Sequence, residues 1–165
     1  MDKNMNDASK KIIDEAASLL IKRRATIAVA ESVTSGNVQA LFSLATNAIS
    51  FFQGGITVYN IGQKCRHLFI EPTHALECNC VSKKISGKMA LEVCNLFSAE
   101  YGIGITGYAS PVPEQNIKRL FTYISIARGK KIVASKKIFA PQGSQQEVQL
   151  HYTEKAVHML IEVLK

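Results

Sequence analysis

The sequence predicts an α/β domain in which helices cover both faces of a mixed sheet, a three-layer α/β/α arrangement. Short β-branched or glycine-containing apolar segments alternate with longer segments whose apolar residues recur every three or four positions. Two apolar segments, 120–128 and 131–139, are separated only by Gly129-Lys130, which predicts an antiparallel hairpin. The alternation predicts parallel strands, and the hairpin adds an antiparallel pair.

Composition predicts a single domain over residues 1–165. The chain of 165 residues is 47% apolar, as in ordinary globular proteins, and contains no linker or repeat. No apolar run reaches the roughly 18–20 residues of a membrane span, and the first residues lack the apolar core of a signal peptide. We therefore expect a cytoplasmic protein without a membrane partner, whose four cysteines are reduced thiols.

The first part of the chain is predicted to contain two helices and two strands. Residues 8–23 have the apolar spacing of an amphipathic helix, and residues 26–30 form a buried strand. Residues 36–47 are predicted to be a second helix. The glycines of 51–55 predict a tight bend, and the β-branched and aromatic residues of 56–59 favour a strand.

The second part begins with a short helix at 63–69 and a loop at 71–80 around Pro72. Ser82 is predicted to cap a long helix that ends near Phe97. The elements that follow are a strand at 101–106, an irregular loop at 107–113, the hairpin, a turn at 140–144 and a helix at 145–164. Gly102 and Gly104 are interpreted as strand glycines that permit close packing.

The candidate site lies where strands end. In α/β sheets, ligands bind where the carboxyl ends of strands meet the amino ends of helices, which selects the loops 31–36, 59–64 and 106–111. The first loop places hydroxyls and unpaired backbone N–H groups together, as anion and oxyanion sites require. Read locally, Ser32 or Thr34 is more often a helix cap than a nucleophile, so both interpretations remain open.

The formal charge of +7 allows a phosphorylated small molecule as partner. Basic residues are dispersed in short groups without interleaved aromatics, so a solvated surface is favoured over a nucleic-acid groove. One cluster invites a zinc interpretation, because three cysteines and two histidines fall within 16 residues: Cys65, His67, His74, Cys78 and Cys80. The spacing matches no standard zinc site, so reduced cysteines around the core are favoured and no metal is expected.

Five segments, in order, resemble motifs of the CinA C-terminal domain family. Ala30-Glu-Ser-Val-Thr-Ser-Gly36 is similar to Ala-Glu-Ser-Cys-Thr-Gly-Gly, and Phe51-Phe-Gln-Gly-Gly-Ile-Thr-Val-Tyr59 to Trp-Phe-x-x-Gly-x-x-x-Tyr. Lys64 stands five residues after Tyr59, where the family has a lysine. Val81-Ser82 and Gly104-Ile-Thr-Gly-Tyr-Ala-Ser-Pro111 resemble the remaining two motifs.

The resemblance implies a nicotinamide-nucleotide amidase of NAD salvage, a homo-oligomer that needs neither metal nor cofactor. It would hydrolyse the carboxamide of nicotinamide mononucleotide, with Ser32 as nucleophile, Lys64 as general base and Tyr59 as a partner near the site. Backbone N–H groups of 33–36 would stabilise the oxyanion. The implied substrate-binding residues are Glu31, Val33, Thr34, Ser35, Gly36, Asn60, Thr106 and Gly107.

Departures from the family pattern lie in the same site. Val33 replaces the cysteine, Ser35 replaces a glycine, and Ile61 stands at the usual asparagine position. The segments 112–122 and 139–149 lack the family's glycine-rich and arginine residues. Two functions therefore remain: an amidase for nicotinamide mononucleotide or a related nucleotide amide, or a catalytically degenerate ligand-binding or interaction domain.

Overall fold

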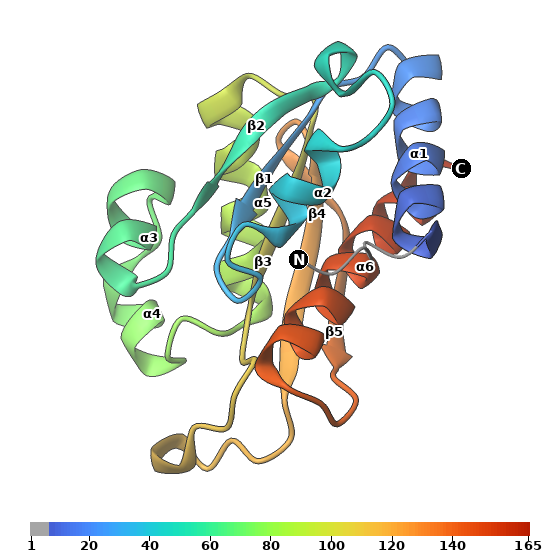
Figure 1. Ribbon diagram of the computed structural model, residues 1–165. Coiled ribbons are helices and arrows are strands. Elements are labelled where there is room, and N and C mark those ends of the chain that lie inside the picture. Colours follow the sequence, from blue (N-terminus) through green and yellow to red (C-terminus); the bar gives the residue numbers. More distant parts are fainter. Residues whose placement is uncertain (1–6) are drawn as a thin grey trace.

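The computed structural model describes residues 7–165, which form one five-stranded mixed sheet with helices on both faces (Figure 1). The strand order is β2-β1-β3-β4-β5. The first three strands in this order are mutually parallel, and β4 and β5 are antiparallel additions. The strands are β1 (Ile27–Glu31), β2 (Phe52–Thr57), β3 (Tyr101–Gly107), β4 (Phe121–Arg128) and β5 (Lys131–Phe139).

Helices cover both faces of the sheet, which confirms the predicted three-layer α/β/α class. One layer contains α1 (Asp7–Lys22), α2 (Asn37–Ser43) and α6 (Gln145–Leu164), and the other contains α3 (Ile61–Leu68), α4 (Pro72–Glu77) and α5 (Lys83–Phe97) (Figure 1). Short 3-10 helices lie at Ala48–Ser50 and Pro113–Gln115. Among residues 7–165, no helix is both long and apolar enough to cross a membrane.

The central strand β1 separates two apolar cores. Ile27 and Val29 face the core under α1, α2 and α6, whereas Ala28 and Ala30 face the core under α5. Small residues on the second face let α5 lie close to the sheet. On β3, a Cβ added at Gly104 would overlap the backbone of Ser86. The predicted packing role of the strand glycines is confirmed.

Two predicted connections are wrong. The segment predicted as a tight bend, 51–55, instead forms most of β2, where Gly54 has φ 123° and Gly55 packs directly against Val29 O and the Gln39 side chain. The expected loop at 71–80 contains α4. Pro72 occupies its first turn, and the Glu71 carboxylate caps it by accepting hydrogen bonds from two backbone N–H groups.

Three local predictions are confirmed. Ser82 caps α5, because its Oγ accepts a hydrogen bond from Ile85 N at 3.1 Å. Gly129, with φ 57°, lies in the two-residue turn between β4 and β5. Helix α6 begins at Gln145, as predicted, and Ser144 and Glu147 form a capping box at its start.

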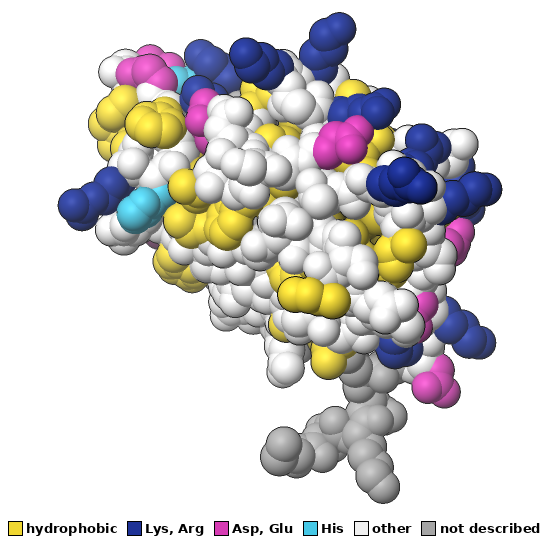
Figure 2. Space-filling view, turned by 90° about the horizontal axis from the view of Figure 1, so that it is seen from above, with side chains coloured by type: hydrophobic (Ala, Val, Ile, Leu, Met, Phe, Trp, Pro, Cys, Tyr) yellow, Lys and Arg dark blue, Asp and Glu magenta, His cyan; other side chains and the backbone are white. Residues whose placement is uncertain are grey.

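Surface charge is distributed rather than gathered. Figure 2 shows one face of the molecule, on which Lys and Arg side chains lie mostly around the edge, separated by uncharged surface and by Asp and Glu. Several lysines pair with nearby carboxylates, such as Lys136 with Glu162 at 2.6 Å. This arrangement gives no continuous basic strip on that face for a nucleic-acid backbone to follow.

The close approach of α5 to β3 predicts a large cost for the change Gly104→Ala. The added methyl group would overlap backbone atoms of α5, and overpacking of this kind costs about 1–3 kcal/mol. Urea denaturation should therefore show a lower unfolding midpoint. Gly62→Ala is the control: its Cβ would meet only Asn60 Oδ1 at 3.4 Å, and the helix α3 should become slightly more stable. An unchanged midpoint in Gly104→Ala would contradict this packing.

Candidate active site

The turn after β1 is organised by the side chain of Glu31, which is fully buried. Four donors bond to its carboxylate oxygens at 2.6–3.1 Å: Thr34 Oγ1 and the N–H groups of Gly36, Val38 and Gln39. The last three donors belong to the start of α2, whose N-cap residue has no side chain to supply a bond. A negative charge at this helix end is favourable, so Glu31 acts as the cap.

This geometry places four of the predicted substrate-binding residues away from the cavity beside Ser32. Glu31 and Thr34 are fully buried and bonded to each other, and Gly36 N donates to Glu31. Ser35 is exposed on the outer side of the turn, with φ 51°. These residues shape the turn, because their polar atoms are used within it, and none of them lines the cavity.

Ser32 and Lys64 come together from different elements. Ser32 follows β1, and its N–H still donates to Ile105 O of β3 at 3.1 Å, so its backbone is held by the sheet. Lys64 lies one turn into α3, which Asn60 caps through Gln63 N at 3.0 Å. Lys64 Nζ is 2.9 Å from Ser32 Oγ. The side chains are thus adjacent although 32 positions separate them in the sequence.

Lys64 is buried, with 1% of its surface exposed. Its Nζ donates to Val58 O at 2.9 Å and to Tyr59 O at 3.2 Å. None of the carboxylates in the described part of the chain forms an ion pair with it. Burial therefore lowers the pKa of Lys64 from its ordinary 10.5, opposed only in part by the nearby thiols of Cys80 and Cys65.

The thiol of Cys80 does not provide a counter-charge for Lys64. Burial raises the pKa of Cys80 above its ordinary 9.0, and this effect outweighs the opposite influence of Lys64. A protonated thiol carries no charge at neutral pH. The amine of Lys64 is thus buried without a charged partner, which favours its unprotonated form.

A cavity of about 380 Å³ opens beside the pair, bordered by the loops after β1, β2 and β3. These are the loops that the sequence selects. Of the predicted site residues, the cavity brings together Ser32, Val33, Tyr59, Asn60, Lys64, Thr106 and Gly107. Tyr59 lies at the cavity but is 69% exposed, so its ring is mostly in solvent rather than against Ser32. Thr106 Oγ1 donates to Cys80 O at 2.8 Å and holds two walls together.

Fewer backbone donors face an oxyanion than the sequence predicts. Ser35 N donates to Ser32 O at 3.2 Å, and Gly36 N is bonded to Glu31. The N–H groups of Val33 and Thr34 have no hydrogen-bond acceptor within residues 7–165. Two of the four expected donors therefore remain free.

Helix α6 contributes residues that the sequence analysis did not assign to the site. Gln149 Nε2 donates to Val33 O at 3.0 Å and approaches Ser35 Oγ at 3.4 Å, and Gln145 lines the same cavity. The spacing of four residues between the two glutamines, at the start of a predicted helix, was the available signal. Tyr108 and Asn79 also line the cavity and are bonded to each other at 3.2 Å.

The cysteine and histidine cluster does not assemble into a metal site. His67 Nε2 pairs with Gln63 Oε1, and His74 Nε2 with Ser82 Oγ, each at 3.0 Å. Across the described range 7–165, no group of three or more His, Cys, Asp or Glu side chains has an arrangement that holds a metal ion. The geometry gives the zinc interpretation no support.

A second cavity of about 630 Å³ adjoins the first and shares Ala109, Ser110 and Gln145 with it. Lys118 and Arg119 line this cavity. The guanidinium carbon of Arg119 is 3.9 Å from the ring centroid of Phe139, which fixes its orientation. A basic pair thus lies next to the space that Ser32 and Lys64 face.

Comparison with known proteins identifies the relatives of this chain. The family model "CinA C-terminal domain" matches residues 9–164. A "CinA-like protein" of Picosynechococcus sp. is 35% identical over 100 residues, covering 61% of this chain and 24% of that protein. A "CinA-like protein" of Solibacter usitatus is 29% identical over 145 residues, covering 86% of this chain and 34% of that protein. The chain therefore spans about a quarter to a third of the length of these relatives.

Solved structures share the fold. A competence or damage-inducible protein from Enterobacter asburiae superposes with a TM-score of 0.89 at 20% identity, over 95% of this chain and 98% of that one. The competence/damage inducible protein CihA from Agrobacterium tumefaciens superposes with a TM-score of 0.88 at 16% identity, over the whole of both chains. At these identities the likeness establishes the architecture.

The buried carboxylate of Glu31 predicts a marked loss of stability in Glu31→Gln. An amide would direct its NH2 group at backbone donors of α2, leaving a buried donor unsatisfied at a cost of about 1–3 kcal/mol. The unfolding midpoint in urea should fall. The exposed Glu162→Gln is the control and should lower it only slightly, because an exposed ion pair such as that of Glu162 with Lys136 contributes at most about 1 kcal/mol. A Glu31→Gln protein as stable as the parent would show that the carboxylate does not hold this turn.

Proposed function

The chain belongs to the CinA C-terminal domain family, and from this premise we propose that it is an amidohydrolase acting on nicotinamide mononucleotide or a related nucleotide amide. The products would be the corresponding carboxylate and ammonia. The observation that carries the proposal is the distance of 2.9 Å between Lys64 Nζ and Ser32 Oγ, with the lysine buried and lacking a carboxylate partner. Such a pair is the arrangement of an activated serine nucleophile.

The hydrogen bonds of Lys64 support the role of general base. A neutral amine has two N–H groups and one lone pair. Two backbone carbonyls, of Val58 and Tyr59, accept the two N–H groups. The lone pair then faces Ser32 Oγ and can take its proton. If the amine is protonated, its third N–H group donates to Ser32 Oγ instead, and no lone pair is available to accept the serine proton.

The reaction follows from these positions. Ser32 Oγ bonds to the carboxamide carbon as its proton moves to Lys64 Nζ. The free N–H group of Val33, a residue that lines the cavity, stabilises the tetrahedral oxyanion, at typically about 3 kcal/mol for such a donor. Collapse of the intermediate breaks the C–N bond, and Lys64 returns the proton to the departing nitrogen, which leaves as ammonia. Water then hydrolyses the acyl-serine, with Lys64 again as base.

The adjoining cavity supports a negatively charged substrate. The family's arginines are absent from 139–149, but Lys118 and Arg119 line the space next to the candidate site. Guanidinium and ammonium groups form charge-assisted hydrogen bonds with phosphate oxygens. In this proposal the carboxamide lies at Ser32 and the phosphate lies toward the Lys118–Arg119 pair.

The second candidate function is a ligand-binding or interaction domain without turnover. Ile61 lines the cavity at a position where the family pattern has a polar side chain, and Ser35 adopts a left-handed conformation that favours glycine. Both features alter the surroundings of Ser32 while leaving the Ser32–Lys64 pair intact. In this alternative, the cavity holds a nucleotide but releases it unchanged.

Incubation with nicotinamide mononucleotide should release ammonia, and the changes Ser32→Ala and Lys64→Met should each reduce the rate by at least about 1,000-fold. The exposed Ser18→Ala, on α1, is the matched serine control and should retain the parent rate. Ammonia production that survives Ser32→Ala would contradict the nucleophile. A folded parent protein that binds the nucleotide but releases no ammonia would favour the second function.

The lowered pKa of Lys64 predicts a characteristic pH dependence. Because the base must be neutral, kcat/KM should rise with pH through an apparent pKa below the ordinary 10.5 of lysine. Between the folded and unfolded pKa values the unfolded chain binds more protons, so the free energy of unfolding should also rise with pH in that window. Urea denaturation of the parent and of Lys64→Met across pH isolates this contribution.

The two measurements check each other. The stability difference between the parent and Lys64→Met should change with pH through the same interval in which kcat/KM rises. A pH–rate profile with its inflection near 10.5, or a stability difference that is independent of pH, would show that Lys64 is not perturbed by its surroundings.

A further inference from the structure

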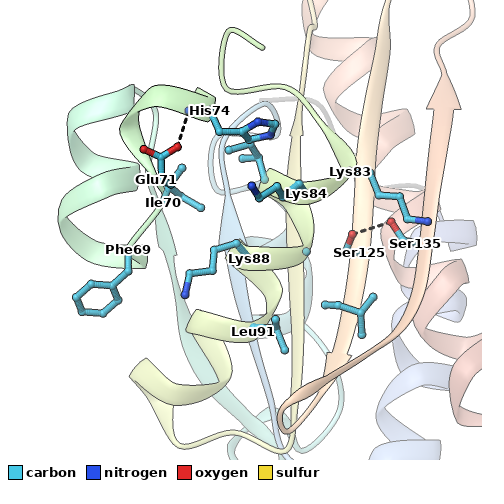
Figure 3. Close-up of a pocket in the computed structure, with 13 residues that line it drawn as sticks. Phe69, Ile70, Glu71, His74, Lys83, Lys84, Lys88, Leu91, Ser125 and Ser135 are labelled. Carbon is cyan, nitrogen blue, oxygen red and sulfur yellow. Dashed lines mark hydrogen bonds between the residues drawn. The ribbon is translucent and has the colours of Figure 1, made fainter. Parts of the chain in front are cut away.

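A further cavity, beside α5, has no part in the candidate active site. It encloses about 770 Å³ between the end of α3, the start of α4, the first half of α5 and strands β4 and β5 (Figure 3). It shares no lining residue with the cavity at Ser32. Its volume falls within the range of roughly 300–1,000 Å³ typical of small-molecule sites.

The surface of this cleft is mainly apolar. Ile70 and Ile85 are buried at its base, and Leu91 and Ile132 are partly exposed along it. Phe69 lies at its margin with 69% of its surface exposed. An apolar ligand that covered these side chains would remove them from water, which is the main source of affinity in such sites.

Positive charge lines one side of the same cleft. Lys84 and Lys88 are one helical turn apart on α5 and extend toward the α3–α4 side, as Figure 3 shows. Lys88 pairs with Glu92, whereas Lys84 has no ion-pair partner in the part of the chain that the structure describes. The nearest acid, Glu71, uses both carboxylate oxygens to cap α4. Glu71 also lines the cleft, but three lysines do so as well, namely Lys83, Lys84 and Lys88, and an anionic group on a ligand would therefore meet a net positive charge.

Gly87 provides a second, independent indication of an occupant. It lies inside α5 on the wall of the cleft, and a Cβ there would meet only Ile132, at an ordinary 3.7 Å. Neither its φ angle nor its packing requires glycine, in contrast to Gly104. Glycine is unfavourable in a helix interior, so this residue does not benefit the fold. Its effect is to leave volume open beside Ile132.

We propose that this cleft binds a small amphiphilic carboxylate, with the carboxylate at Lys84 and Lys88 and the apolar chain over Leu91 toward Gly87 and Ile132. A second copy of the chain fits less well, because the formal charge is +7 and a symmetric contact would bring these lysines together. The site is independent of the reaction proposed at Ser32.

Titration of decanoate into the full chain, below its micelle-forming concentration, tests the proposal by calorimetry and by amide NMR shifts. Decanoate should bind at least ten-fold more tightly than decanol, and octanoate more weakly than decanoate by about four-fold for each lost CH2. Shifts should appear at Gly87 and Ile132. Ser32→Ala should bind decanoate as the parent does, which separates this site from the proposed catalytic one.

Variants localise the binding. Lys84→Gln should weaken decanoate at least five-fold, and Gly87→Leu, which fills the cleft, at least ten-fold. Lys130→Gln, in the exposed β4–β5 turn, is the matched charge control and should leave the affinity unchanged. If Gly87→Leu does not fold, Leu91→Gln replaces it with the same expected loss.

Four outcomes would overturn the proposal. The first is equal affinity for decanol and decanoate, and the second is equal weakening by Lys130→Gln and Lys84→Gln. The third is parent-like affinity in a folded Gly87→Leu or Leu91→Gln protein. The fourth is binding to phosphatidylglycerol vesicles without binding to free decanoate. The last would assign the basic side chains to a membrane surface instead of a small molecule.

Discussion

A single buried carboxylate determines where the candidate nucleophile lies. Glu31 ends β1 and accepts hydrogen bonds from the first turn of α2, so the chain between strand and helix has one compact conformation. Ser32 is the residue that this conformation leaves facing the cavity. Without the Glu31 carboxylate, the N-terminus of α2 would have no side-chain cap and would lose the hydrogen bonds that hold it next to the end of β1. The geometry at Ser32 therefore depends on a residue that does not itself contact the cavity.

The second constraint is the burial of Lys64, which couples the position of α3 to the chemistry of its side chain. Two carbonyls just after β2 and the hydroxyl of Ser32 surround the amine, and the protonated thiol of Cys80 lies nearby. A buried amine without a counter-charge is costly to the fold when protonated. The arrangement is understandable if the neutral amine serves a purpose, because a leucine would fill the same space at lower cost.

The architecture was accessible from the sequence because the periodicity of its apolar residues differs clearly between helices and strands. Residues 131–139 and 145–164 were predicted with the observed bounds. The failures involve glycine and proline. Gly55 occurs inside the edge strand β2 because the Gln39 side chain occupies the space of a Cβ, and Gly54 occurs there because its φ is 123° and the Phe97 ring lies against it. Pro72 begins a helix because Glu71 caps it. The strand glycines depend on neighbours in space, whereas Pro72 follows its cap directly in the sequence.

At the site, the loops were predicted but the direction of each side chain was not. The sequence places Glu31, Thr34 and Gly36 in the turn, yet only the folded turn reveals that their polar atoms bond to one another. For the contribution of Gln149, the sequence offers only the spacing of Gln145 and Gln149 at the start of the predicted helix as a signal. Its bond to Val33 O joins residues 116 positions apart, one on a turn and the other on the last helix. During synthesis from the ribosome, the strands and α3 can therefore associate before this bond exists, and the turn that presents Ser32 is completed only after the final helix has emerged and packed against the sheet.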